Sequence, residues 1–303
     1  ALRAAGDARV PMYVALLTNL LHLALAVALT FGYDGTLLQW SALHLKGTAL
    51  GAGIAHITGS AILLYLWMSN RLLIRFHRPR LQRDVFARLW SIASPAVVEQ
   101  MVMQMSLLLF LGLIARYGDA PFAAYGIGLS ILSVTMVVGL GFSISGAALV
   151  GQAIGAGNAA AARAAALKAL KLAALTMTVL GAIVLFFAEP LANFMIDDAE
   201  TVRLTTVFLW VLACTQPFMA VDFALGGALR GAGDTRFALV ATLFTFVGLR
   251  VGVAGLLTWL NSPVEYIFAT LVIDYGVKAL LLSWRYRTDH WLRAIGSTNQ
   301  STT

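Results

Sequence analysis

The chain has 303 residues, of which 60% are hydrophobic and 12% are charged, and its formal net charge is +7. Ordinary soluble domains carry about 25% charged residues, so the composition excludes a water-soluble globule and predicts an all-α protein that crosses a membrane several times. The single cysteine, Cys214, excludes an intrachain disulfide and a metal site built from several cysteines.

Apolar runs of about 20 residues follow one another along the chain, and each is long enough to cross a hydrocarbon core of about 30 Å as a helix. After the last run, the small and polar tail 296–303 predicts disorder. We expect residues 149–158 to form a helix end and a turn. The predicted spans are 12–32, 48–69, 92–116, 121–148, 162–188, 202–227, 237–259 and 264–285.

Basic residues are concentrated in alternate connections between these spans, and Lys and Arg mark the cytoplasmic side of a membrane. The pattern therefore predicts a cytoplasmic C-terminus. It also argues against a nucleic-acid partner, which would need the bases gathered on a soluble domain. The basic set is Arg3, Arg9, Arg71, Arg75, Arg78, Arg80, Arg83, Arg88, Arg163, Lys168, Lys171, Arg230, Arg236, Arg285, Arg287 and Arg293.

A nine-residue stretch occurs twice, at 1–9 and at 228–236, with seven of nine positions identical. Between 92 and 227, four predicted spans lead up to the second copy, and two spans follow it, which makes a unit of six. The first copy has only the two spans that follow it, 12–32 and 48–69. The duplication predicts two parallel six-helix lobes, twelve helices in all. We expect this chain to hold the last two helices of the N-lobe in 1–69, a basic cytoplasmic linker at 70–90, the whole C-lobe in 91–288 and a cytoplasmic tail at 289–303.

The repeated stretch itself is interpreted as a turn rather than a site. Gly231 and Gly233 suit a helix-terminating turn. A phosphate-binding loop of the Walker type is excluded because Gly233-Asp234-Thr235 lacks the required Lys. The sequence thus predicts a cytoplasmic hinge between two spans.

Ionisable residues inside the predicted spans are functional candidates, because each costs at least about 2.5–3.5 kcal/mol to insert. Glu99 stands out, with Gln100, Met103 and Gln104 nearby. Its carboxylate can be neutralised by a proton, by Na⁺ or by an organic cation, which is the competition that antiport needs. The alternative is a buried structural pair with Arg250.

The other candidates have simpler alternatives. Asp222 follows the helix-breaking Pro217 and is either a second cation ligand or an acid that reaches the cytoplasmic surface. Asp274 and Lys278 stand at i and i+4, so we expect them to neutralise each other. His56 is either a pH sensor or a packing residue. It lies beside a stripe of small residues that permits close helix contact, Gly47, Gly51, Ala55 and Gly59.

Several motifs resemble those of the MATE (multidrug and toxic compound extrusion) transporters of the MOP superfamily. They are 150–158, 228–235, Pro95 with Glu99, Arg250 and Asp274 with Tyr275. The resemblance implies a two-lobed antiporter in a bacterial inner membrane, of which this chain would be helices 5–12. It also implies acids at two positions where this chain has Ala26, in the fifth helix, and Met219, in the tenth, with Asp222 one turn beyond Met219.

We therefore expect a secondary transporter that exchanges H⁺ or Na⁺ for cationic or amphipathic organic compounds. The alternatives are a flippase for lipid-linked saccharides and a non-transporting fragment. We expect a monomer in the lipid bilayer that has no enzyme activity, no organic cofactor and no metal other than Na⁺ at Glu99 and Asp222. The candidate cation- and substrate-binding residues are Glu99, Asp222, Gln100, Gln104, Met103, Arg250 and His56.

Overall fold

The computed structural model describes the chain except residues 1, 3–5, 35–38, 41, 73–82 and 293–303. Two compact units make up the chain, an N-terminal unit, Ala1–Arg80, and a C-terminal unit, Leu81–Thr303. The tail expected to be disordered, 296–303, lies outside the described residues, as do residues 73–82 of the predicted linker.

The N-terminal unit is a pair of packed helices. Helix α1 (Arg9–Phe31) leads through a short antiparallel pairing of β1 (Tyr33–Asp34) with β2 (Gln39–Trp40) into α2 (His44–Met68). The predicted small-residue stripe forms the contact between the helices, since Gly47, Gly51, Ala55 and Gly59 are the buried residues of α2. The two-residue strands were not predicted.

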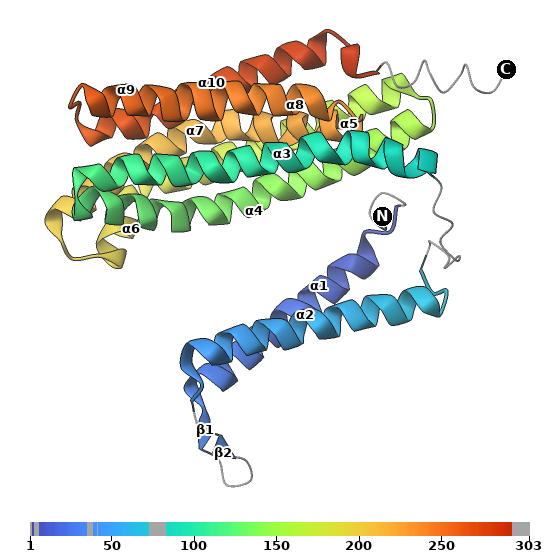
Figure 1. The fold of residues 1–303 in the computed structure, drawn as a ribbon, viewed down its shortest axis with the longest axis horizontal. Helices are drawn as coiled ribbons and strands as arrows, with labels where there is room; N and C mark the ends of the chain where they lie inside the picture. The colour runs from blue at the N-terminus through green and yellow to red at the C-terminus, as the bar shows by residue number, and fades with distance from the viewer. Residues whose placement is uncertain (1, 3–5, 35–38, 41, 73–82, 293–303) are drawn as a thin grey trace. The chain divides into compact units, whose positions relative to one another are not determined.

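The C-terminal unit is a helical bundle whose long members run lengthwise together (Figure 1). Within the described residues, this unit together with α1 and α2 provides eight helices long and apolar enough to cross a membrane, so each predicted span is confirmed. Its elements are α3 (Arg83–Ile114), η1 (Ala115–Tyr117), α4 (Asp119–Gly155), α5 (Ala159–Phe186), α6 (Ala188–Met195), α7 (Ala199–Gly231), α8 (Thr235–Thr242), η2 (Leu243–Val253), α9 (Ala254–Trp259), α10 (Val264–Arg287) and η3 (His290–Leu292).

Helix ends differ from the predicted spans because a helix can continue where its apolar composition stops. Helix α4 runs seven residues past its predicted end at 148, to Gly155, and α3 begins at Arg83 inside the predicted linker. The short helix α6 was not predicted, since its eight residues are too few to register as a span.

The predicted hinge is confirmed as a turn and has a defined geometry. Helix α7 ends at Gly231, and Gly233 takes a φ of +85°, which glycine adopts without strain. The Asp234 amide donates to the Leu229 carbonyl at 2.9 Å, and the Gly233 amide donates to the Arg230 carbonyl at 3.0 Å. This pair of bonds is a Schellman motif, which satisfies the free carbonyls at the helix end.

Helix α7 is the centre of the bundle and buries the largest share of its membrane-spanning window, 61%. It packs against α4, α5 and α10. Close approach to α4 depends on glycine, since a Cβ at Gly227 or Gly231 would overlap the backbone of Ser143 or Ala147. The buried face of α7 consequently brings its polar residues within reach of three neighbouring helices.

Two departures from regular α-helix lie near these polar residues. Pro217 stands inside α7, where it cannot donate to the helix ladder. Between α8 and α9 the chain forms the π-helical segment η2, which buries Thr245, Phe246 and Arg250. Such segments occur frequently at functional sites.

Candidate functional site

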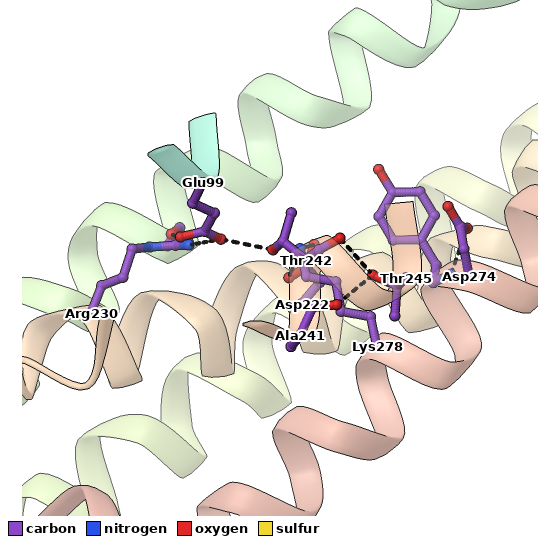
Figure 2. A network of polar contacts seen from close by, with 10 residues as sticks. Glu99, Asp222, Arg230, Ala241, Thr242, Thr245, Asp274 and Lys278 are labelled. Atoms are coloured by element: carbon purple, nitrogen blue, oxygen red, sulfur yellow. Dashed lines mark hydrogen bonds and ion pairs between the residues drawn. The ribbon is translucent and has the colours of Figure 1, made fainter. Parts of the chain in front are cut away.

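Three acids and three bases form ion pairs in the interior of the C-terminal unit, and Figure 2 labels all three acids and two of the bases, Arg230 and Lys278. They come from α3, α7, η2 and α10, and every pair joins two different elements. All three carboxylates are buried. The pairs are Glu99 with Arg230, Asp222 with Lys278, and Asp274 with Arg250.

Glu99 on α3 is 4% exposed, and one of its oxygens receives two donors. Arg230 Nη1 and Thr242 Oγ1 each donate to Glu99 Oε1 at 3.1 Å. Arg230 Nη2 also donates to Ser143 Oγ on α4 at 3.2 Å, which orients the guanidinium. The carboxylate is thus held by α7 and α8 from both sides of the Schellman turn.

Asp222 and Lys278 form the second pair, between α7 and α10. Lys278 Nζ lies 3.0 Å from Asp222 Oδ1 and 3.1 Å from Oδ2. Its ammonium also lies 4.9 Å from the centroid of the Phe246 ring, where the electron-rich face attracts a cation. Both partners are buried, so this pair is sealed inside the bundle.

Arg250 and Asp274 form the third pair, between η2 and α10. Arg250 Nε donates to one carboxylate oxygen, and the Tyr275 amide donates to the other at 2.6 Å. The guanidinium carbon lies 4.0 Å from the Phe246 ring centroid and 5.0 Å from that of Tyr275. Arg250 Nη2 is buried and has no hydrogen-bond partner within the described part of the chain.

A small cavity of about 80 Å³ lies beside this arginine. It brings together three of the predicted candidates, Met103, Gln104 and Arg250. The remaining lining residues are mainly apolar and aromatic: Leu107, Tyr125, Leu129, Leu132, Met136, Phe246, Leu271 and Tyr275.

The observed partners differ from two of those considered on the sequence. Lys278 contacts Asp222 of α7, so the predicted pairing of Asp274 with Lys278 along α10 is wrong. Arg250 takes Asp274, so the alternative pair of Glu99 with Arg250 is also wrong. In both cases a facing helix supplies a charge within hydrogen-bond distance, which a periodic pattern along one helix does not reveal.

Sequence reasoning missed Arg230 as a site residue, because it lies in the repeated stretch that was interpreted only as a hinge. Its long side chain reaches back from the end of α7 to Glu99. A signal was present in the charge count. Among the candidates, three acids, Glu99, Asp222 and Asp274, stand against two strong bases, Arg250 and Lys278, so one acid needed a base from outside that set.

Two other predicted candidates lie away from this network. Gln100 is exposed on α3. His56 lies in the N-terminal unit, also exposed, with its ring centroid 6.2 Å from that of the half-buried His22. Among the described residues there is no group of three or more His, Cys, Asp or Glu side chains placed to hold a metal ion.

Comparisons with known proteins identify one protein family. A family model described as MatE matches residues 95–256. A probable multidrug resistance protein NorM of Thermotoga maritima is 26% identical over 284 residues, covering 88% of this chain and 59% of that protein. An FAD transporter of Shewanella oneidensis is 27% identical over 291 residues, covering 93% and 59%. The chain therefore spans about three-fifths of the length of these curated relatives.

Solved structures show the same fold. A MOP superfamily transporter from Pyrococcus furiosus, described as having a binding pocket of reverse polarity, superposes with a TM-score of 0.86 at 18% identity. The match covers 96% of this chain and 64% of that one. An outward-facing multidrug resistance MATE transporter superposes with a TM-score of 0.82, also at 18% identity, covering 97% and 64%.

Proposed function

The chain belongs to the MatE family, and on that basis we propose that it is a secondary transporter that exports cationic or amphipathic organic compounds in exchange for H⁺ or Na⁺. The multidrug resistance relatives support organic export. The observation that carries the exchange is the pair of Glu99 with Arg230, because its two side chains differ in their exposure.

The Glu99 side chain is 5% exposed and the Arg230 side chain is 32% exposed. When a proton or a cation neutralises Glu99, the arginine is partly exposed and need not remain as a fully buried, unpaired charge. A long side chain at a helix end keeps its charged head solvated at little cost. The carboxylate can thus exchange one partner for another, which is the competition that antiport requires.

The other two pairs are less suited to this exchange. Side-chain exposure is 3% for Lys278 and 10% for Asp222, and 6% for Arg250 and 0% for Asp274. Removing one member of a buried pair leaves an uncompensated charge and typically costs about 3–5 kcal/mol. We therefore assign the cation-coupled step to Glu99 and not to the other two pairs. Asp222 would accept Na⁺ only by displacing Lys278.

The charge balance also favours cationic over anionic cargo. A flippase for lipid-linked saccharides would need basic side chains free to hold a pyrophosphate. Here Arg230, Arg250 and Lys278 each contact an acid. A relative that transports FAD is nevertheless among the curated matches, so the test must include lipid probes.

We further propose that the protein acts as a monomer in the bacterial inner membrane with its C-terminus in the cytoplasm. The alternation of basic and acidic connections supports this orientation. An ion gradient would be its only energy source, with no organic cofactor involved.

The test is transport into inverted membrane vesicles under an imposed proton or sodium gradient, with a fluorescent organic cation as the probe. We expect uptake that follows one of the two gradients and is lost in Glu99→Gln, because the amide cannot exchange cations. Wild-type uptake and ion dependence in Glu99→Gln would overturn the assignment. A response to neither gradient, together with translocation of a lipid probe, would indicate the flippase.

A further inference from the structure

We propose that the cavity beside Arg250 is a binding subsite for a carbonyl oxygen of an uncharged or amphipathic organic molecule. The cavity has a volume of about 80 Å³ and lies among α3, α4, η2 and α10. Arg250 is 5% exposed, and its Nη2 finds no partner among the described residues. This buried donor is the observation that points to a ligand.

The arginine is fixed in place, so its free donor has a defined direction. Nε is bound to Asp274, and the guanidinium lies against the faces of Phe246 and Tyr275. A guanidinium carries only donors. The group that completes it must therefore be an acceptor, since a buried donor left unpaired is costly.

The net charge around Arg250 favours an uncharged acceptor over an anionic one. Arg250 with Asp274 sums to zero, and so does the neighbouring pair of Lys278 with Asp222. A carboxylate or phosphate entering the cavity would add a negative charge without a matching positive one, in a region where unpaired charge is strongly disfavoured. An uncharged oxygen completes the hydrogen bond and leaves the balance intact.

The lining indicates what is attached to that oxygen. Aromatic and flexible apolar side chains, Tyr125, Phe246, Met103 and Met136, line the cavity together with Arg250. Methionine adapts its shape to different neighbours, and aromatic rings pack well against planar groups. The cavity is small, so it accommodates the carbonyl end of a molecule with an aryl or alkyl group behind it.

The subsite rests on the proposed function only in treating the bound molecule as cargo. Glu99 would couple transport to the ion gradient, whereas Arg250 would bind the polar end of the compound. A binding measurement without a gradient therefore tests the subsite separately from the coupling to ions.

The experiment uses the purified protein in detergent and three fluorinated probes measured by ¹⁹F NMR. The probes are 4-fluoroacetophenone, the similarly shaped 1-ethyl-4-fluorobenzene, which lacks an acceptor, and the anion 4-fluorobenzoate. One hydrogen bond to a charged donor predicts about tenfold tighter binding of the ketone than of the hydrocarbon. Arg250→Met combined with Asp274→Asn, which keeps the site neutral, should abolish that preference.

Two further variants keep the test decisive. Met136→Trp fills the cavity without touching the ion pair, so both uncharged probes should lose their specific binding. Arg203→Met with Glu265→Gln removes an exposed pair of the same kind and should keep the tenfold preference. Equal binding of ketone and hydrocarbon would show that Arg250 does not select a carbonyl acceptor, and tightest binding of the benzoate would show an anion site. Either result overturns the proposal.

Discussion

Replacing Arg230 with methionine should destabilise the protein more than replacing Glu99 with glutamine. In Arg230→Met the Glu99 carboxylate stays 4% exposed and keeps only the Thr242 hydroxyl as a side-chain donor. In Glu99→Gln the arginine left behind is 32% exposed and turns to water. The same ion pair therefore predicts two unequal single-mutant effects.

The size of each loss in stability follows from how deeply Glu99 and Arg230 are buried. Breaking a fully buried pair costs about 3–5 kcal/mol, and an exposed pair contributes about 0–1 kcal/mol. Because Arg230 is about one-third exposed, we expect a loss of about 2 kcal/mol for Arg230→Met. The loss for Glu99→Gln should stay below about 1 kcal/mol.

The assay is a double-mutant cycle on the purified protein in detergent, with the free energy of unfolding measured by chemical denaturation. The double variant should recover most of the loss caused by Arg230→Met, because the stranded carboxylate is gone. The pair of Arg203 with Glu265, which is exposed at 59% and 31%, serves as the matched control and should show weak coupling. Strictly additive effects at Glu99 and Arg230 would refute the reasoning.

Two further predictions concern the scaffold. Gly227→Ala should lower stability by about 1–3 kcal/mol, since the added methyl overlaps the backbone of Ser143. Gly126→Ala, where a Cβ meets nothing within 4 Å, should leave the melting temperature unchanged, and equal melting of the two would contradict the close contact of α4 and α7. Hydrogen bonds from Thr201 lower the pKa of Asp198. The stabilising contribution of Asp198 is therefore present above the unfolded pKa and lost as pH falls through the folded pKa. In Asp198→Asn, the free energy of unfolding should depend less on pH in the acid range.

The fold could be predicted from the sequence because its main signals are local. Eight runs of apolar residues fix eight spans whatever their neighbours are. The stripe at Gly47, Gly51, Ala55 and Gly59 predicted a helix contact for a similar reason, since close packing needs small residues at helical spacing. The turn at Gly233 likewise follows from one residue's freedom to adopt positive φ.

The candidate site could be predicted only in part, because ion pairs depend on which helices face each other. Glu99, Asp222, Asp274, Arg250 and Lys278 were all identified as ionisable residues inside spans. Their partners were not, since the choice between a neighbour on the same helix and one across the bundle is tertiary. The π-helical segment at 243–253 gave no sequence signal, and it carries Arg250 toward α10.

The two hydrogen bonds donated to Glu99 Oε1 link α3 to two helices at once. Arg230 lies in the last turn of α7 and Thr242 is the last residue of α8, so the two donors lie on the two arms of one helical hairpin. A single atom of α3, Glu99 Oε1, thus accepts hydrogen bonds from both arms. Neutralising Glu99 therefore weakens its side-chain contact with α7 and its side-chain contact with α8 together.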